Sequence, residues 1–267
     1  MIVLITGASG GFGAVLGELL TSEGLTVYGT CRNPGEQPQD RPFPMLAMEI
    51  GDDASVAGCV SELLAREGRI DVVINCVNEM MIGSVEEQTV EEFAALYDTN
   101  VFGALRVIQQ VLPAMRAQGS GLIVSMSSLG GLIAVPTMSA YTSAKFALEA
   151  MSEALYHELA GTGIDVVIMQ PVAMHMDRPA TGSHLHTVQN VEAGSRSLRM
   201  LERMTADTEA SKLTPEQVAR RVLRVIRSGK RPLRVPMDRA RPLSLVKRLA
   251  PQAVIDRLIA GLIPRDA

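Results

Sequence analysis

The segment Thr6-Gly-Ala-Ser-Gly-Gly-Phe-Gly13 decides the fold, because it joins a short apolar run to an amphipathic one. The run before it, Ile2-Val-Leu-Ile-Thr6, is typical of a buried strand, and residues 11–23 have helical spacing. Glycine lets a backbone approach a phosphate closely, and the N–H groups at a helix N-terminus stabilise the phosphate charge. A strand, a glycine-rich turn and a helix in this order therefore predict a site for the pyrophosphate of a dinucleotide.

Strand-like and helix-like segments alternate beyond this turn. Apolar and β-branched runs predict further strands over residues 26–30, 46–50, 72–75, 122–127 and 165–170. Helical patterns lie between them, over residues 55–66, 90–117 and 140–159. Strict alternation implies a parallel sheet covered by helices on both faces. The predicted fold class is therefore α/β, a doubly wound parallel sheet of the Rossmann type.

Length and composition fit a single domain over residues 1–267, because the chain has 267 residues of which 47% are hydrophobic. Two segments break the alternation. Residues 173–213 have weak periodicity and scattered Met, His and Gly, which favours a mobile loop over the substrate with some helix in it. Residues 242–264 carry leucines near helical spacing, interrupted by Pro251, and are expected to form a C-terminal amphipathic segment.

Capping boxes mark two helix starts. Thr89 is followed three residues later by Glu92, and Thr214 by Gln217, so each threonine can cap a helix whose third residue reaches back. Pro215 then occupies the first helical position, where its missing N–H has no cost. We therefore expect helices to begin directly after Thr89 and Thr214.

The net charge of −4 is unevenly distributed along the chain. From Arg196 onward there are 17 Lys and Arg against 7 Asp and Glu, whereas the preceding part has 8 against 22. This basic C-terminal third either attracts an anionic substrate or acidic partner, or consists of solvated helix faces. No nucleic-acid site is expected.

Several features predict a cytoplasmic protein without an integral membrane segment. The chain starts on a strand-like run instead of a charged and then apolar leader, and no uncharged apolar stretch reaches bilayer length. The cysteines Cys31, Cys59 and Cys76 are odd in number and lie in strand-like or helix-like segments. We expect them to be reduced thiols.

Arg32 decides the expected choice of cofactor. It follows the second predicted strand in Gly29-Thr-Cys-Arg-Asn33, where the adenine ribose of a dinucleotide lies. An acidic residue at this point would bind the free 2′-hydroxyl of NAD, but a guanidinium pairs with the 2′-phosphate of NADP. NADP is therefore expected, with NAD as the alternative, and Arg41 in the next loop could take over from Arg32.

These motifs resemble those of the classical short-chain dehydrogenase/reductase family. Gly7, Gly11 and Gly13 match its Thr-Gly-x3-Gly-x-Gly pattern, and Ser128 stands ahead of a Tyr-x3-Lys motif formed by Tyr141 and Lys145. Asn100, in Asp98-Thr-Asn-Val-Phe-Gly103, matches the fourth member of the family's catalytic tetrad. The spacing of the extended subfamily also fits, but the length of the chain favours the classical one.

The resemblance implies that Asn100, Ser128, Tyr141 and Lys145 are the catalytic residues. Tyr141 would exchange a proton with the substrate oxygen, Ser128 would hydrogen-bond that oxygen, and Asn100 would anchor a relay water. Lys145 would hold the nicotinamide ribose. It lies four residues after Tyr141 on a predicted helix, and an ammonium nearby would favour the phenolate. No metal is expected to take part, although His175, His184 and His186 lie in the predicted loop.

The expected cofactor-binding residues come from the glycine-rich turn, from the ends of successive strands and from the Tyr-x3-Lys motif. Glu49-Ile50 ends the third predicted strand, where the family has Asp-Val beside the adenine ring. The full expected set is Gly7, Ser9, Gly11, Phe12, Gly13, Arg32, Glu49, Ile50, Asn75, Tyr141, Lys145 and Val172.

Two segments depart from the family pattern. Asn75-Cys-Val-Asn78 stands where the family has Asn-Asn-Ala-Gly, and Pro171-Val172 replaces Pro-Gly. Met176 lies near the position of a threonine that hydrogen-bonds the nicotinamide end. The departures leave three outcomes open: weaker cofactor binding, a reshaped substrate pocket, or a different reaction.

The leading functional hypothesis is an NADPH-dependent oxidoreductase that interconverts a ketone or aldehyde and an alcohol by hydride transfer. The sequence around Ser128 and Tyr141 resembles that of the family branch that acts on steroids and retinoids. The small-molecule substrate is therefore expected to be apolar. The alternatives are a non-redox lyase, isomerase or cyclase of a biosynthetic pathway, and a cofactor-sensing binding protein. Family resemblance also implies a homodimer or homotetramer, paired through the helices that follow Asn100 and carry Tyr141.

Overall fold

A seven-stranded parallel sheet forms the centre of the molecule. The computed structural model describes residues 1–38, 40–175, 185–188, 191–192 and 194–261. In this part of the chain the strand order is β3-β2-β1-β4-β6-β7-β9, and every neighbouring pair is parallel. The doubly wound sheet predicted from the alternation is therefore confirmed. The strands are β1 (Ile2–Thr6), β2 (Thr26–Cys31), β3 (Met45–Ala47), β4 (Val72–Asn75), β6 (Gly121–Met126), β7 (Ile164–Gln170) and β9 (Arg234–Pro236).

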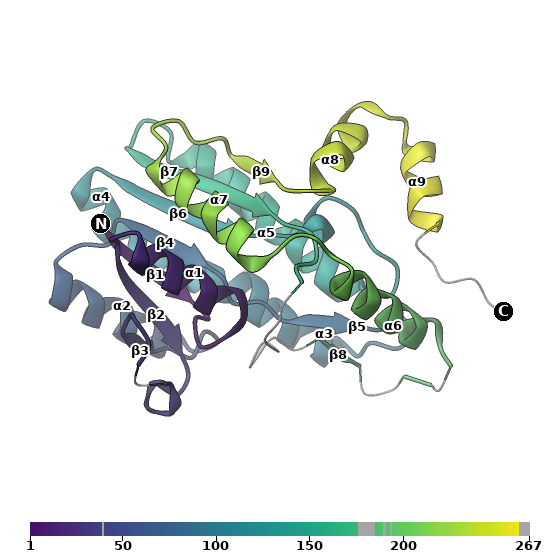
Figure 1. The fold of residues 1–267 in the computed structure, drawn as a ribbon, viewed down its shortest axis with the longest axis horizontal. Helices are drawn as coiled ribbons and strands as arrows, with labels where there is room; N and C mark the ends of the chain where they lie inside the picture. The colour runs from purple at the N-terminus through teal and green to yellow at the C-terminus, as the bar shows by residue number, and fades with distance from the viewer. Residues whose placement is uncertain (39, 176–184, 189–190, 193, 262–267) are drawn as a thin grey trace.

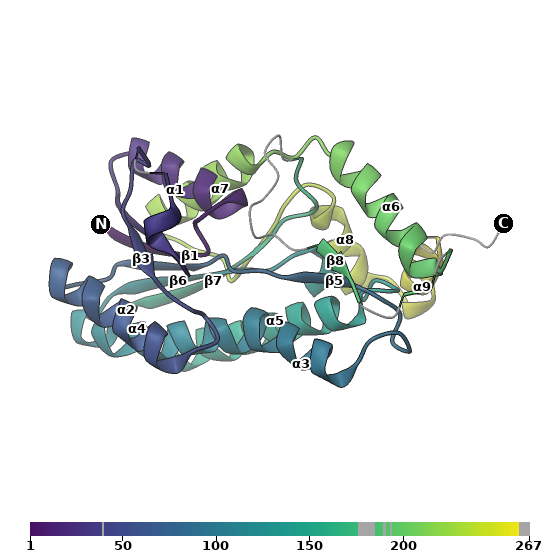
Figure 2. The same ribbon diagram turned by 90° about the horizontal axis from the view of Figure 1, so that it is seen from below.

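Helices cover both faces of this sheet (Figures 1 and 2). One face carries α1 (Gly11–Ser22) and α7 (Pro215–Arg227), which pack against each other. The other face carries α2 (Asp53–Glu67), α4 (Gly103–Gln118) and α5 (Ser139–Glu158), as Figure 2 shows edge-on. The inner strands β1, β4, β6 and β7 therefore have both of their faces buried, which explains why these segments are almost continuously apolar.

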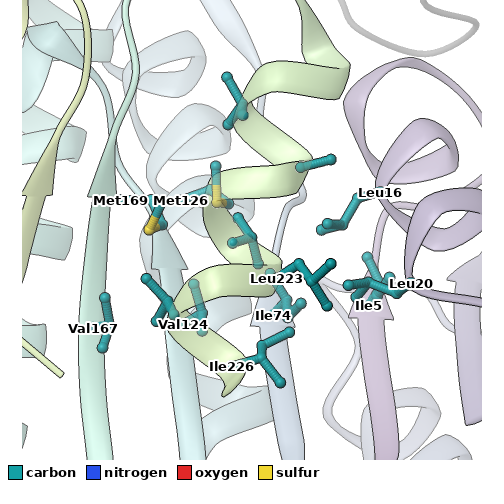
Figure 3. Packing of buried hydrophobic residues seen from close by; sticks show 14 of the residues in the cluster. Ile5, Leu16, Leu20, Ile74, Val124, Met126, Val167, Met169, Leu223 and Ile226 are labelled. Carbon is teal, nitrogen blue, oxygen red and sulfur yellow. The ribbon is translucent and has the colours of Figure 1, made fainter. Parts of the chain in front are cut away.

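The alternation of side chains along each strand divides the core into two clusters. On β1, Val3 and Ile5 belong to the cluster under α1 and α7, whereas Leu4 belongs to the cluster under α2 and α4. Figure 3 shows the first cluster, in which Leu223 and Ile226 of α7 lie over Ile5 and Val124. The two clusters fix the sheet between its helix layers, so the strand ends are held rigidly.

The sheet differs from the prediction at its edges. The third strand ends at Ala47, so Glu49 and Ile50 follow the strand and do not end it as predicted. The edge strand β9 was not predicted, because its three residues include two with poor strand propensity. A second, two-stranded parallel sheet pairs β5 (Met80–Ile82) with β8 (Leu185–Thr187).

The helix predicted over residues 90–117 contains a widened turn. It consists of α3 (Val90–Tyr97), a π-helical turn over Asp98–Phe102, and α4. The N–H of Gly103 donates to the carbonyl oxygen of Asp98, five residues earlier. Asn100 lies in this turn and is buried. Hydrophobic periodicity predicts the helix as a whole, but it is too coarse to reveal one additional residue in a single turn.

Both capping boxes are formed, at Thr89 and at Thr214. Within the predicted loop of residues 173–213 the structure has α6 (Arg196–Glu209), while residues 176–184, 189–190 and 193 lie outside the described part. The C-terminal segment forms α8 (Ala240–Leu249) and α9 (Gln252–Ala260), which Pro251 separates; residues 262–264 are again outside it. Among the described helices, none is long and apolar enough to cross a membrane.

Candidate active site

A cavity of about 920 Å³ lies at the carboxyl ends of the strands. Its walls include the glycine-rich turn after β1, the residues that follow β2 and β4, and the loops after β6 and β7. Further walls come from α5, α6, α8 and α9. Ligands of doubly wound sheets bind in the crevice beyond the carboxyl ends of the strands. The cavity therefore has the position that the fold assigns to a dinucleotide and a substrate.

The glycine-rich turn forms one end of the cavity. Gly7 and Gly11 have φ angles of +69° and +53°, which favour glycine over residues with a Cβ. A Cβ at Gly13 would overlap the carbonyl oxygen of Gly7. Ser9 and Phe12 line the cavity between these glycines. The turn is thus an open backbone cradle that side chains would fill, and it suits the close approach of a pyrophosphate.

Arg41 holds the glycine-rich turn from behind. Its guanidinium donates to the carbonyl oxygens of Ala8 and Ser9 over 2.6 and 2.9 Å, and lies 5.2 Å from the ring centroid of Phe43. Arg32, in contrast, is exposed and lines the cavity. The two arginines therefore differ in role, because Arg41 is occupied with the backbone of the turn and Arg32 faces the cavity.

The other expected cofactor residues are distributed unevenly. Glu49, Ile50 and Val172 line the cavity. Asn75 is buried beneath the wall and is not among the lining residues; neither its amide nitrogen nor its amide oxygen has a hydrogen-bond partner in the described part of the chain. Cys76, the next residue, does line the cavity, and burial raises the pKa of its thiol to about 12.

Asn100 supports the cavity from outside its walls. Its side-chain amide donates to the carbonyl oxygen of Glu79 and accepts from the N–H of the same residue, each over 2.8 Å. Thr6 holds the preceding residues, because its hydroxyl accepts from the N–H groups of Cys76 and Val77 over 3.0 and 3.3 Å. Asn100 and Thr6 together fix the segment of residues 76–79 that lines the cavity.

Ser128 and Tyr141 line the same cavity as the glycine-rich turn. Ser128 begins a short 3₁₀ turn after β6, and its hydroxyl accepts from the N–H of Gly130 over 3.2 Å. Tyr141 is 6% exposed, near the start of α5. Burial raises the pKa of its phenol to about 12, and a hydrogen bond with Ser128 acts in the opposite direction.

Lys145 is one turn further along α5 and is 1% exposed. Its ammonium donates to the carbonyl oxygen of Met126 over 2.9 Å and lies 5.7 Å from the ring centroid of Tyr141. Burial lowers the pKa of Lys145 to about 8, while Cys76 and Glu149 oppose this shift. The pKa of Tyr141 is therefore raised by burial, contrary to the lowering expected from the nearby ammonium, and the lowering contribution comes from Ser128 instead.

Glu149, one turn beyond Lys145, belongs to a buried polar network that sequence reasoning missed. Its carboxylate accepts from the side-chain amide of Gln170 over 2.8 Å and from the guanidinium of Arg234 over 2.9 Å. Arg234 also pairs with Glu153 over 2.9 Å. The spacing of Glu149 from Lys145 was visible in the sequence, but its partners come from β7 and β9, which pattern reasoning does not pair with α5.

The structure brings Ser128, Tyr141 and Lys145 to one cavity wall, and Asn100 to a supporting position behind residue Glu79. The outer wall from α6 lies in the segment of residues 173–213 that was expected over the substrate, whereas the walls from α8 and α9 are additional residues that the sequence did not indicate. Of the three histidines considered for a metal, the N–H of His175 donates to the carbonyl oxygen of Leu213. His184 and the side chain of His186 lie outside the described part.

Comparison with known proteins assigns the family. The model of the short chain dehydrogenase family matches residues 1–181, so the chain belongs to this family of oxidoreductases. The resemblance carried by the Gly-rich turn and the Tyr-x3-Lys motif is thereby confirmed.

Two curated relatives are similar to the chain. A 3-ketodihydrosphingosine reductase of Bacteroides thetaiotaomicron is 38% identical over 170 residues, which are 64% of this chain and 62% of that protein. The match thus spans less than two thirds of that relative's length. Oxidoreductase BOA17 of Botryotinia fuckeliana is 34% identical over 246 residues, covering 88% of this chain and 87% of that protein.

Solved structures share the fold. A short-chain dehydrogenase from Streptomyces avermitilis has a TM-score of 0.82 at 29% identity, covering 98% of this chain and 95% of its own. One from Burkholderia cenocepacia in complex with NADP has a TM-score of 0.75 at 23% identity, covering 96% of both chains. One from Burkholderia phymatum in complex with NAD has a TM-score of 0.77 at 21% identity, covering 100% of this chain and 96% of its own. The fold thus accommodates either nicotinamide dinucleotide.

Proposed function

We propose that this protein is an NADPH-dependent oxidoreductase that interconverts a ketone or aldehyde and an alcohol on an apolar small molecule. The observation that carries the proposal is the shared cavity. Ser128, Tyr141 and Lys145 line the same space as the glycine-rich turn after β1. Groups suited to proton transfer and to binding a pyrophosphate therefore face one substrate-sized volume.

The residues of the cavity fit a nicotinamide dinucleotide. Positive φ angles favour glycine at Gly7 and Gly11, and the carbonyl oxygen of Gly7 leaves no room for a Cβ at Gly13, so no side chain of these residues covers the backbone of the turn. Ile50 and Val172 supply apolar contacts along the cavity and Glu49 a carboxylate. When bound, the cofactor supplies or accepts the hydride, and the side chains of this chain handle the proton.

Tyr141 is the proton donor in the direction of reduction. Its phenol is protonated at neutral pH, because burial raises its pKa to about 12. Donation to a carbonyl oxygen is favourable only as that oxygen gains charge during reaction, which confines the transfer to the transition state. Ser128, hydrogen-bonded to Tyr141, stabilises the same oxygen as it becomes negative.

Lys145 returns a proton to the buried phenol of Tyr141 after the phenol has donated its own. Its pKa of about 8 lets it exchange a proton near neutral pH, which the phenol cannot do itself. The bond to the carbonyl oxygen of Met126 fixes the ammonium beside the ring of Tyr141. Asn100 acts through the backbone of Glu79, which it holds by two hydrogen bonds in the wall of the same cavity.

NADP is the proposed cofactor because of Arg32. The exposed guanidinium lines the cavity just after β2, where a 2′-phosphate would lie. No carboxylate follows β2 at residues 32–35 to bind a free 2′-hydroxyl or to repel a phosphate. NAD is the alternative.

An apolar substrate is proposed from the outer walls of the cavity. Methionines from the loop after β7 and from α6 line it with aliphatic residues of α8, and their flexible side chains adapt to varied shapes. The Bacteroides relative is named for the reduction of a keto group of a sphingoid compound, which agrees with a lipophilic ketone as substrate.

A cytoplasmic location is proposed because Cys31, Cys59 and Cys76 are all free thiols in the structure. Burial raises the pKa of the Cys59 and Cys76 thiols to about 12, so both stay protonated and unreactive at neutral pH.

Cofactor consumption tests the proposal. The protein is incubated with NADPH and a panel of apolar ketones, and NADPH loss and alcohol formation are both quantified. We expect one alcohol for each NADPH oxidised. Conversion of a substrate without NADPH oxidation would instead support a lyase, isomerase or cyclase. The observation that favours this alternative is the buried Val172, which stands where the family has Gly. Tight NADPH binding without any conversion would support a cofactor-sensing protein.

A further inference from the structure

Helices α8 and α9 expose large apolar side chains to solvent. Leu245 and Leu249 of α8 are 58% and 72% exposed, and Val254 and Leu258 of α9 are 40% and 51% exposed. Residues four apart share a face of a helix, so each helix presents one apolar pair. We name these four residues the α8–α9 face. Contiguous exposed apolar residues on consecutive helices mark an interaction surface.

Basic residues accompany the apolar pairs. Arg248 lies three residues after Leu245 on the same face of α8. Arg241 lies four residues before Leu245, and its guanidinium also donates to the carbonyl oxygen of Pro236 over 3.2 Å. Arg257 lies three residues after Val254 on α9. The ten residues of α8 include Arg241, Lys247 and Arg248 and no acidic residue. Leucines bordered by cationic side chains are the composition of helices that lie in the interface of an anionic bilayer.

The attachment of α8 directs its leucines outward. Lys247, between Leu245 and Leu249 and on the opposite side of the helix, donates to the carbonyl oxygen of Leu132. Its ammonium also lies 4.5 Å from the ring centroid of Phe146 on α5. Both contacts hold α8 to the body of the protein. In Figure 1 α8 and α9 project beyond one end of the sheet.

The inner sides of the same helices line the cavity. Leu243 and Val246 of α8 and Ile255 and Ile259 of α9 belong to the wall of the volume that contains Tyr141. Leu258 of the α8–α9 face reaches this wall as well. Two helices therefore separate an exposed apolar surface from an apolar cavity. A lipophilic molecule that leaves a bilayer at the α8–α9 face would enter the cavity after a small displacement of these helices.

We propose that the α8–α9 face docks reversibly on an anionic phospholipid membrane. The charge distribution supports a membrane over a second copy of the chain. In a two-fold dimer the face would meet itself and bring Arg241, Arg248 and Arg257 against the same cations, which is unfavourable. An anionic bilayer neutralises them.

Vesicle co-sedimentation of the full-length chain tests the docking. We expect the protein to bind vesicles of phosphatidylcholine with phosphatidylserine, and to bind vesicles of phosphatidylcholine alone far more weakly. Replacing Leu245 and Leu249 together by Ser removes buried apolar area and should abolish binding. Neither leucine lines the cavity, so the double variant should keep the activity and the cofactor affinity of the wild type.

Two further comparisons separate the apolar and electrostatic contributions. Arg248→Gln should weaken vesicle binding about fivefold, which corresponds to ~1 kcal/mol for one basic residue near an anionic surface. Binding should also weaken as salt increases. The matched control replaces Val85 and Val90 by Ser, because these residues are 74% and 79% exposed but lie outside the face. The control variant should bind vesicles like the wild type.

Three results would overturn the proposal. The first is equal binding of wild type and the Leu245→Ser, Leu249→Ser variant to anionic vesicles. The second is the absence of wild-type binding to any vesicle. The third is a wild-type oligomer that the same double variant converts to a monomer in light scattering, because a second copy would then cover the face. The measurement does not depend on turnover, so it stands independently of the proposed reaction.

Discussion

Glu149 follows Lys145 by one turn of α5, and both side chains are buried. The carboxylate of Glu149 raises the pKa of the ammonium, but the stronger effect of burial leaves it at about 8. Gln170 and Arg234 hold the carboxylate in place from β7 and β9. The protonation of Lys145 is therefore set by a balance between burial, which lowers its pKa, and the opposing effects of Cys76 and Glu149.

The lowered pKa of Lys145 makes folding stability depend on pH. The pKa is about 8 in the folded chain and 10.5 at its ordinary value, so the unfolded chain binds the additional proton between these limits. The penalty for the buried ammonium is present below pH 8 and is relieved as pH rises toward 10.5. We expect wild type to gain about 1–2 kcal/mol relative to Lys145→Met between pH 8 and 9.5, measured by urea unfolding.

The difference between wild type and Lys145→Met matters here, because Cys59 and Cys76 have raised pKa values that oppose the trend in both proteins. Glu149→Gln provides a second comparison. Without its charge the Lys145 pKa falls further, so the gain in stability should begin at a lower pH. A pH-independent difference between wild type and Lys145→Met would show that Lys145 is not strained by burial.

Tyr141→Phe should leave the fold and NADPH affinity nearly unchanged and lower kcat by orders of magnitude. The phenol hydroxyl is the only part removed, and it supplies the proton in the proposed reaction. Circular dichroism and cofactor titration serve as controls, and single-turnover hydride transfer is the readout. Activity within about tenfold of wild type, a barrier change of ~1.4 kcal/mol, would exclude Tyr141 as the acid.

Asn100→Ala should destabilise the protein and reduce activity together. It removes both hydrogen bonds to the backbone of Glu79 and leaves those polar groups without their partner. We expect a loss of about 2–3 kcal/mol in the free energy of unfolding. The control is Asn33→Ala, an exposed asparagine bonded to Glu36 over 3.3 Å, with an expected change of about 0.5 kcal/mol or less. Similar losses in both variants would contradict the supporting role of Asn100.

Arg32→Ala should lower the preference for NADP over NAD roughly ten- to hundredfold, because a charge-assisted contact to the 2′-phosphate contributes about 1.5–3 kcal/mol. Arg41→Ala should weaken both cofactors alike, since Arg41 supports the backbone of Ala8 and Ser9. Fluorescence titration of each variant with both cofactors distinguishes the two roles. A wild type that binds NAD more tightly, or an unchanged ratio in Arg32→Ala, argues against the assignment of NADP.

A homodimer or homotetramer is expected through α4 and α5. On α5, Ala150 and Ala154 are exposed and small enough for close helix approach, and Tyr156 is 38% exposed beside them. Ala144 of the same helix is buried inside the chain and cannot take part. Light scattering should give a multiple of 28.6 kDa, and Ala150→Arg should shift it to the single-chain mass. A wild-type mass of 28.6 kDa would contradict the prediction.

The sheet and its helices could be predicted from the sequence because their signals are local. The inner strands are apolar on both faces, and the residues that follow Thr89 and Thr214 mark these threonines as helix starts. The short strands β5, β8 and β9 could not be predicted, since three residues carry no periodicity and their pairing comes from packing.

The site was predictable where it rests on side-chain type and spacing, as for Ser128, Tyr141 and Lys145. Contacts between distant segments were not. The bonds of Arg41 to Ala8 and Ser9 join residues more than thirty positions apart, and the pair of Glu149 and Arg234 spans 85. Residues so far apart in the sequence become partners only when the chain folds. A sequence pattern therefore shows that a charged residue is present but does not show what it binds.

The π-helical turn over Asp98–Phe102 gives the long helix two rotational phases. Before the turn, α3 packs beside α5; after it, Val107 and Val111 of α4 face the core beneath the sheet. Each residue of an α-helix advances by about 100°, so removing one residue here would rotate α4 by that amount relative to Asn100. A homologue that lacks one residue in this stretch could therefore keep the amide beside Glu79 or the core contacts of α4, but not both. We expect a change in the active-site wall of such a homologue to be accompanied by a change in its core.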